Sequence, residues 1–272
     1  MSGLSAQRQA IADAVWARLN READAMVKTE PMLAGFVHDA VLRHGSLERA
    51  LSFLLADKLS SRYLSALALA ELFEDAFASS ADIRQAMRAD LDAVVDRDPA
   101  ARSLAIPFLY FKGFQALQSY RVAHWLWAQE RAQLALHLQS RISEMFNVDI
   151  HPAARIGKGI LIDHGTSVVI GETAVIGDNV SLLHEVTLGG TGKESGDRHP
   201  KVGYGVIIGA GAKILGNIRI GEGSKIAACS VVLCDVPSHS TVAGIPAKVV
   251  GKPRTAEPAL TMEQTFDGDY AI

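Results

Sequence analysis

The 272-residue sequence predicts an α+β protein, in which an α-helical N-terminal domain is followed by a parallel β-helix. The main observation is an aliphatic residue that returns every six positions over much of the stretch from Ile150 to about Val236. Such a period, with small residues at the corners, is typical of a parallel β-helix, because each coil buries its aliphatic residues against the next. A sandwich of short strands would instead need turn signals roughly every 8 to 12 residues.

The repeated positions all carry even numbers, as one face of a strand requires, because successive side chains point to opposite sides. The aliphatic series consists of Ile150, Ile156, Ile162, Val168, Ile170, Ile176, Leu182, Leu188, Ile208, Ile214, Ile220, Ile226 and Val232. A second set of inward candidates, usually smaller, consists of Ala154, Thr166, Ala174, Val180, Val186, Ala212, Ser224 and Ser230.

Two breaks interrupt this period. The phase slips by two residues between Val168 and Ile170, and residues 189–205 are inserted between Leu188 and Ile208. A solenoid accommodates an insertion as a loop on one face, and such loops often carry function. The polar stretch 191–201 is therefore the first candidate for a functional site.

The first 146 residues have helical patterning. Apolar residues such as Ile11, Val15 and Leu19 recur at three- and four-residue spacing, and proline and serine breaks predict roughly six to eight helices. We expect three parts, namely a helical domain (1–146), a β-helix domain with the inserted loop 189–205 (147–251), and a C-terminal tail (252–272). The tail has Pro, Gly and acidic residues but no hexad period, so it should be mobile when free.

Composition narrows the class of protein. A formal net charge of −3 gives no reason to expect a nucleic-acid partner. The chain start has no apolar h-region, and no apolar run approaches the roughly 18 residues of a membrane span. We therefore expect a cytoplasmic protein without a membrane partner. In that setting we expect Cys229 and Cys234 to be reduced, packed thiols, with a lone disulfide as the alternative.

Histidines supply the candidate chemistry of the repeat. Asp163 and His164 form a polar pair among Ile, Val, Ala and Gly, and a neutral imidazole is a natural general base near pH 7. Adjacent strand residues point opposite ways, so Asp163 should not orient His164, and Asp149 is a better candidate for that role. A single histidine could also be purely structural, and no role is expected for His184.

Several motifs together resemble one family, the serine acetyltransferases of bacterial cysteine biosynthesis, over nearly the whole chain. In the repeat they are Asp149–Gly157, Asp163–Thr166, Gly171–Gly177, Val186–Lys193 and Asp197–Lys201, and in the helical half Glu30–Leu33, Asp57–Ser61, Arg97–Pro99 and Tyr120–Trp125. The resemblance implies a left-handed β-helix and transfer of acetyl from acetyl-CoA to the hydroxyl of L-serine. Ser167 and His184 depart from the common pattern of that family.

The same resemblance implies a role for each matching residue. His164 would be the general base and Asp149 its partner, in a direct transfer without a covalent relay. The serine pocket would consist of Asp98, Asp163, Arg198 and His199, and the acetyl-CoA groove would include Gly190, Thr191, Ala210, Lys225 and Ala228. Charge supports the pocket, because Arg198 can bind a carboxylate bidentately and two aspartates can bind an ammonium group. Asp98 could equally be only a helix end before Pro99.

The resemblance also implies regulation and partners. L-cysteine should inhibit by occupying the serine pocket, and the chain should form a homohexamer built as a dimer of trimers. The terminal Ile272 should bind O-acetylserine sulfhydrylase, with its carboxylate and apolar side chain held in that enzyme's site. Acetyl-CoA is expected as a co-substrate, with no tightly bound cofactor and no metal.

Other functions remain open on the sequence alone. The chain could be a hexapeptide acyltransferase with another acceptor, a β-helix scaffold without catalysis, or a zinc β-helix carbonic anhydrase. Zinc would need three ligands, and His164, His184 and His199 lack the short spacing seen in those enzymes. The stretch Thr187–Glu194 resembles a phosphate-binding loop but fails at both ends of the motif, so nucleotide hydrolysis is not supported.

Overall fold

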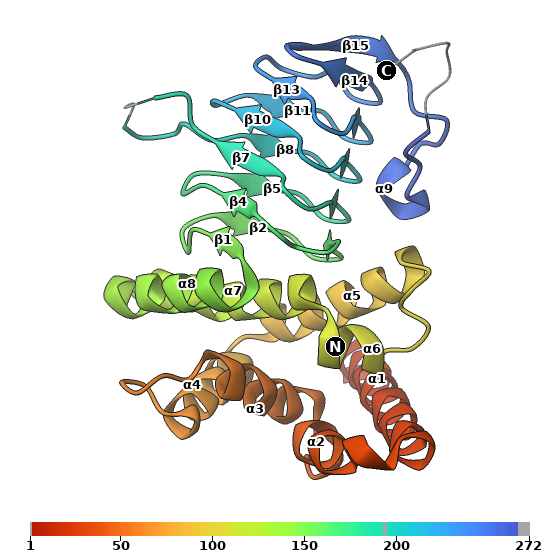
Figure 1. Cartoon of the computed structure of the whole chain (residues 1–272), viewed down its shortest axis with the longest axis vertical. Coiled ribbons are helices and arrows are strands. Elements are labelled where there is room, and N and C mark those ends of the chain that lie inside the picture. The colour runs from red at the N-terminus through yellow and green to blue at the C-terminus, as the bar shows by residue number, and fades with distance from the viewer. Residues whose placement is uncertain (1, 193–194, 266–272) are drawn as a thin grey trace.

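A computed structural model describes residues 2–192 and 195–265, with a layer of helices beneath a stack of β-coils (Figure 1). The eight α-helices of the N-terminal half agree with the predicted number. They are α1 (Ser2–Thr29), α2 (Ala34–Val37), α3 (Leu47–Leu59), α4 (Ala66–Ser79), α5 (Ala81–Arg97), α6 (Ala105–Tyr110), α7 (Lys112–Ala128) and α8 (Ala132–Phe146). A 3₁₀ turn (Pro31–Leu33) and a π turn (His38–Leu42) flank α2.

Serine hydroxyls begin three of these helices. Ser46, Ser65 and Ser80 each accept a hydrogen bond from the backbone N–H three residues later, which satisfies one of the free donors of the first turn. The last helix before the coils, α8, ends at Asn147, whose left-handed φ of 58° turns the chain into the first strand.

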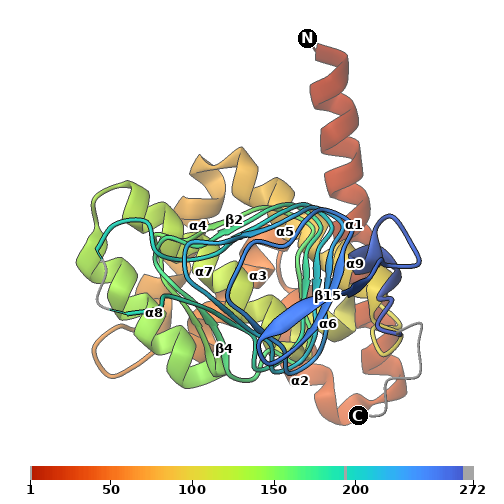
Figure 2. The same cartoon turned by 90° about the horizontal axis from the view of Figure 1, so that it is seen from above.

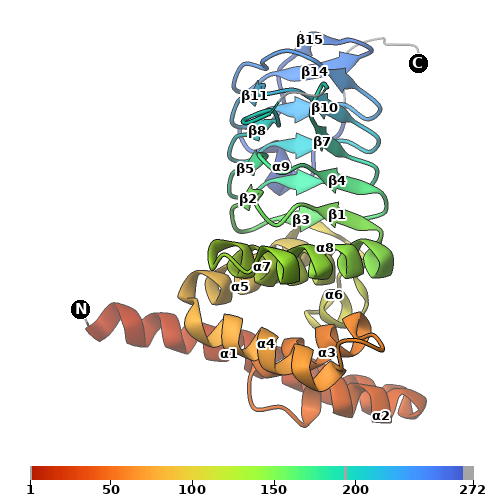
Figure 3. The ribbon, with the colours of Figure 1, turned by 90° about the vertical axis from the view of Figure 1, so that its left-hand side faces the viewer.

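Three strands per coil form three sheets, parallel except for their last pair of strands, and the coils lie over one another (Figures 2 and 3). The five-stranded sheet contains β1 (Val148–Ile150), β4 (Val168–Ile170), β7 (Thr187–Gly189), β10 (Lys213–Leu215) and β13 (Val231–Val232). The four-stranded sheet contains β2 (Arg155–Ile156), β5 (Val175–Ile176), β8 (Lys201–Val202) and β11 (Arg219–Ile220). The six-stranded sheet contains β3 (Leu161–Ile162), β6 (Ser181–Leu182), β9 (Ile207–Ile208), β12 (Lys225–Ile226), β14 (Thr241–Gly244) and β15 (Ala247–Gly251).

Strand register confirms the predicted repeat. Ile150, Ile170, Leu188, Ile214 and Val232 are paired in one ladder through five coils, and all are buried. The antiparallel pair β14–β15 closes the stack at its C-terminal end. The predicted architecture, a helical N-terminal region followed by a β-helix of hexapeptide repeats, is therefore confirmed.

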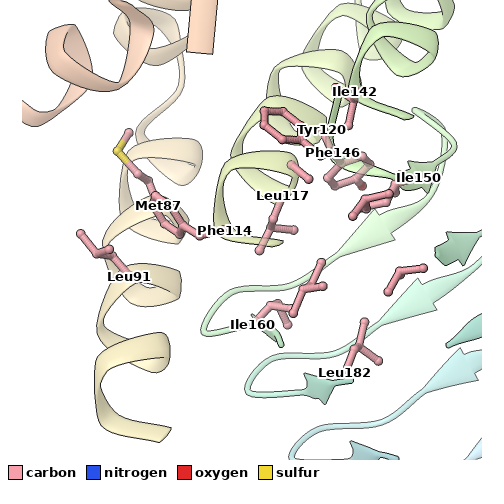
Figure 4. Packing of buried hydrophobic residues seen from close by; sticks show 14 of the residues in the cluster. Met87, Leu91, Phe114, Leu117, Tyr120, Ile142, Phe146, Ile150, Ile160 and Leu182 are labelled. Carbon is pink, nitrogen blue, oxygen red and sulfur yellow. The ribbon is translucent and has the colours of Figure 1, made fainter. Parts of the chain in front are cut away.

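One hydrophobic core runs through both halves of the chain. It extends from Val15 in α1 to Val242 in the last coil. At the junction, Leu117 of α7 and Phe146 of α8 lie near Ile150 of the first coil (Figure 4). The helical layer thus caps the open end of the β-helix, which would otherwise expose its apolar interior to water.

In the C-terminal third one expectation is wrong, and the structure describes part of the predicted tail. Cys229 and Cys234 are free but exposed, because both lie at turns outside the coil interior. Residues 252–265, expected to be part of a mobile tail, follow the wall of the β-helix and form α9 (Pro258–Thr261), in which Pro258 and Ala259 are buried. Ala259 packs there against Leu183 and Ile207 of the coils. Within residues 2–192 and 195–265, no helix is long and apolar enough to cross a membrane.

A buried ion pair connects the helical layer to the first coil. The carboxylate of Asp90 in α5 is fully buried and lies 2.7 Å from the guanidinium of Arg121 in α7. Its other oxygen accepts a hydrogen bond from the backbone N–H of Ile160 at 3.0 Å, and Arg121 donates to the carbonyl of Gly157 at 2.7 Å. Two helices and the first coil are therefore held by one set of charged hydrogen bonds.

We expect Arg121→Met to lower the free energy of unfolding by about 3 kcal/mol or more, because it leaves the Asp90 carboxylate buried without its partner. Denaturant unfolding measures the loss. Lys28→Met is the control, since the Lys28–Asp24 pair is exposed and should be worth less than about 1 kcal/mol. Equal losses for the two variants would contradict the role of the buried pair.

Candidate active site

The first break in the repeat is a corner that is longer than its counterpart one coil later. Ile162 and Leu182 are register partners, as are Ile170 and Leu188. The chain uses eight positions to pass from Ile162 to Ile170 but only six to pass from Leu182 to Leu188. The phase slip seen in the sequence is therefore a two-residue enlargement of the corner 163–167, which carries His164.

This corner has an unusual backbone. His164, Gly165 and Ser167 have φ values of 56°, 69° and 57°, in the left-handed region. A non-glycine residue there costs of order 1–3 kcal/mol and persists only where the surroundings hold it. Asn147 supplies one restraint, because its carbonyl accepts a hydrogen bond from the N–H of Ser167 at 2.8 Å. The side chain of His164 is 73% exposed and is thus accessible to a ligand.

Asp163 and His184 lie beside His164. One carboxylate oxygen of Asp163 is 3.8 Å from Nε2 of His164, and the rings of His164 and His184 meet edge to face with their centroids 5.7 Å apart. The two side chains do not diverge as they would in a strand, because a left-handed corner does not alternate its side chains, but no hydrogen bond among the described residues joins Asp163 to the His164 ring. Burial raises the pKa of Asp163, the charge of His164 opposes the rise, and the charge of Asp98 adds to it.

Asp98 ends α5 and also approaches this group. Its Oδ1 accepts a hydrogen bond from the N–H of Ala100 at 2.8 Å, so it stabilises the turn after the helix. The structure therefore supports both readings of Asp98, the helix end and the neighbour of Asp163. His184 was not expected to belong to a site. The sequence did hold a signal, because His184 follows His164 by twenty residues, the local length of one coil.

A second group of polar side chains surrounds Arg198. Its guanidinium donates to Glu172 at 2.6 Å, and this hydrogen bond lowers the pKa of the Glu172 carboxyl. The hydroxyl oxygen of Thr173 accepts the backbone N–H groups of Arg198 and His199 at 3.0 and 3.1 Å. Residues of the inserted loop are thereby fixed to the corner between β4 and β5, and a cation is presented there.

The ring of His199 has a defined orientation. It is buried, and its Nδ1 accepts the backbone N–H of Thr173 at 3.2 Å and the Thr173 hydroxyl at 2.9 Å. Nδ1 is thus unprotonated, which leaves Nε2 as the donor. Burial and the charge of Arg198 lower the pKa of His199, so the neutral form is favoured.

Asp149 lies in the middle of β1, on the five-stranded sheet, and is bonded neither to Arg198 nor to His164 among the described residues. Its Oδ1 accepts a hydrogen bond from Gln139 at 2.6 Å. Burial lowers the pKa of His151, the charges of Glu172 and Asp149 oppose this shift, and the charge of Arg198 adds to it. In the part of the chain that the structure describes, no hydrogen bond joins Asp149 to His164. The expected pairing of these two residues is therefore not made within one chain.

The two groups occupy different edges of the β-helix. The base edge, where the six-stranded sheet passes into the five-stranded sheet, carries Asp163, His164 and His184. The arginine edge, where the five-stranded sheet passes into the four-stranded sheet, carries Glu172 and Arg198. Among the described residues, 2–192 and 195–265, no hydrogen bond or ion pair links the two groups. One chain therefore presents two separate half-sites.

The expected acetyl-CoA residues are also divided between these edges. His184, Ala210 and Ala228 follow one another up the base edge, because the carbonyl of His184 accepts the N–H of Gly211 and that of Ala210 accepts the N–H of Cys229. Gly190 and Thr191 begin the inserted loop on the arginine edge. An acetyl-CoA groove lined by both sets of residues would therefore need the base edge and the arginine edge to lie side by side.

Lys225 is directed differently from the expectation. It is buried on β12, and its ammonium group lies 2.8 Å from the Glu263 carboxylate and donates to the carbonyl of Thr265. The C-terminal segment therefore binds the Lys225 ammonium group, which was expected to contact a phosphate group.

Comparison with known proteins identifies the family. Residues 15–119 match the family described as Serine acetyltransferase, N-terminal, and residues 199–234 match Bacterial transferase hexapeptide (six repeats). The chain is 54% identical over 254 residues to the serine acetyltransferase of Salmonella typhimurium, an alignment that covers 93% of each chain.

No three His, Cys, Asp or Glu side chains among the described residues could together hold a metal ion.

Solved structures of similar proteins agree with this match. A serine acetyltransferase in complex with cysteine has a TM-score of 0.91 at 53% identity, covering 93% of this chain and 98% of its own. Soybean serine acetyltransferase complexed with serine has a TM-score of 0.86 at 57% identity, covering 88% and 98%. The Brucella abortus enzyme in complex with coenzyme A has a TM-score of 0.88 at 49% identity, covering 92% and 98%. By its sequence and its fold, the chain belongs to the serine acetyltransferase family.

Proposed function

We propose that this chain transfers the acetyl group of acetyl-CoA to the hydroxyl of L-serine, giving O-acetyl-L-serine and CoA. The observation that carries the proposal is the exposed imidazole of His164 beside the half-buried carboxylate of Asp163. The serine and coenzyme A complexes of its relatives support this choice of substrates over another acceptor or a zinc lyase. Both substrates fit a cytoplasmic enzyme, and no resident cofactor is required.

His164 acts as the general base in a direct transfer. It takes the proton of the serine hydroxyl as that oxygen attacks the thioester carbon of acetyl-CoA. The tetrahedral intermediate then expels the CoA thiolate, which receives the proton from the imidazolium. General base catalysis of this kind typically contributes about 10² to 10⁴ in rate. Because no covalent acetyl-enzyme forms, both substrates are bound together, and parallel double-reciprocal plots would contradict this mechanism.

Serine binds through charge at both of its ends. Arg198 and the Nε2–H of His199 hold the carboxylate, since both are donors fixed by the Thr173 corner. Asp163 and Asp98 hold the ammonium group on the base edge. The hydroxyl is then placed next to His164.

Completing this pocket requires a second copy of the chain, because the donors and the acids lie on different edges. We place the base edge of one subunit against the arginine edge of its neighbour in a trimer, so that Asp149 of one copy reaches His164 of the next. We place the contact that joins two trimers into a hexamer on the helical half, where Met32, Tyr63 and Leu67 are exposed.

Acetyl-CoA then lies in the groove between the two edges. Its pantetheine arm passes Ala210 and Ala228 on one side and Gly190 and Thr191 on the other. Lys225 meets a phosphate group only after it releases Glu263, so movement of the C-terminal segment accompanies binding.

Mixing two inactive variants tests the shared site. His164→Ala and Arg198→Ala should each abolish acetyl transfer. Co-expressed in equal amounts, they should recover about a quarter of the sites, because random trimers contain that share of intact pairs of edges. CoA release measures the recovery.

Asp149 provides the matched control for this experiment. Asp149→Asn should be complemented by His164→Ala but not by Arg198→Ala, since in this arrangement Asp149 and Arg198 of one subunit both act at the His164 site of its neighbour. A mixture no more active than its separate components would refute the shared site, and an active His164→Ala enzyme would refute the base.

The raised pKa of Asp163 predicts a pH dependence of serine binding. The carboxylate form holds the ammonium group, so affinity should be full above the raised pKa and should fall as the pH drops through it. An ordinary aspartate has a pKa of about 3.9. Because the pKa of Asp163 is raised, serine affinity should begin to fall at a higher pH than it would with an ordinary aspartate. Serine affinity is measured by calorimetry in the His164→Gln variant, because this substitution removes any charge on the His164 ring. If affinity is independent of pH there, or if Asp163→Asn keeps the same dependence, the assignment is wrong.

L-cysteine and the next enzyme are proposed as further partners. Cysteine carries the same two charged ends as serine, and a relative has been solved in complex with it, so it should compete with serine. Ile272, which lies outside the described residues, is proposed to bind O-acetylserine sulfhydrylase. Deleting Ile272 should abolish that binding in calorimetry and leave CoA release intact. Undiminished binding would remove the terminus from the interface.

A further inference from the structure

A lysine of the helical half contacts the corner that carries His164. Lys112 begins α7, and its ammonium group donates to the hydroxyl oxygen of Thr166 at 2.6 Å in a partly buried position. The helix is pressed against the corner here. A Cβ on Gly113 would lie 2.0 Å from the carbonyl oxygen of Ile162, and one on Gly165 would lie 3.1 Å from the Cα of Gly113.

Thr166 also joins the corners of the two histidines on the base edge. Its carbonyl accepts the N–H of Glu185 at 2.7 Å. Glu185 directly follows His184 and has a left-handed φ of 60°. Thr166 is therefore held by Lys112 on one side and by the His184 corner on the other.

The position of His164 depends on its backbone. Its side chain is largely exposed, and in the described part of the chain its close polar and aromatic neighbours are Asp163 at 3.8 Å and the ring of His184. Neither contact is a strong hydrogen bond. The aim of the imidazole is thus set by the left-handed corner, which needs support from outside itself.

We propose that Lys112 is a positioning residue for acetyl transfer, acting through Thr166 on the corner that aims His164. The proposal rests on the base role given to His164 above. A general base is effective only when it is aligned with the proton that it removes, and a shift of about 1 Å can cost about 100-fold in rate. The helical half then contributes to catalysis and not only to assembly.

The test compares Lys112→Met and Thr166→Val with Thr166→Ser, which keeps the hydroxyl. We expect the first two to lower kcat about tenfold or more, with KM for serine and for acetyl-CoA little changed. Thr166→Ser should retain most of kcat. The double variant Lys112→Met/Thr166→Val should be no slower than either single variant, because both remove the same interaction.

Lys58→Met is the matched control. Lys58 donates to Gln115 at 2.8 Å, also partly buried, but this bond lies within the helical half and does not reach the β-helix. It should change stability, measured by thermal unfolding, without changing kcat.

Three results would overturn the proposal, namely an unchanged kcat in Lys112→Met, losses that multiply in the double variant, or an equal fall in kcat in Lys58→Met. If Lys112→Met does not fold, Thr166→Val decides, since valine has nearly the same shape as threonine. His164→Asn separates the two claims. Activity in that variant refutes the base, whereas an inactive His164→Asn together with a fully active Lys112→Met refutes only the positioning role.

Discussion

The buried ion pair between Asp90 and Arg121 is the constraint on which the rest of the structure depends. Two charges removed from water are tolerated only when their hydrogen bonds are complete, and here the completing groups belong to the backbone of the first coil, at Gly157 and Ile160. The helical layer can therefore dock in one position. Once the first coil is placed, each later coil is set by parallel pairing with the one beneath it.

This docking also brings α7 to the corner of His164. A regular hexapeptide coil has tight corners and an apolar interior, and it has little room for chemistry. Both departures from regularity, the enlarged corner 163–167 and the insertion that holds Arg198, carry polar side chains at edges of the stack. The regular coils supply a rigid frame, and the irregular corners supply the reactive groups.

Much of the fold could be predicted because a β-helix is determined by local repetition. The inward positions from Ile150 to Val232 follow from spacing alone, and Ser46 begins a helix as its side-chain chemistry predicts. The side-chain directions at the irregular corner could not be predicted. Asp163 and His164 lie on the same side because the backbone is left-handed there, and strand alternation does not apply to such a turn.

The sequence by itself determined the helical half, the coil period, the two breaks in that period and the identity of the polar residues within them. Only the tertiary structure decided how those residues are grouped. Asp149 binds Gln139 and not His164, and Lys225 binds the C-terminal segment. The physical reason is that a six-residue period specifies which side chains face inward, whereas the edge that each outward side chain occupies depends on how many residues each corner contains.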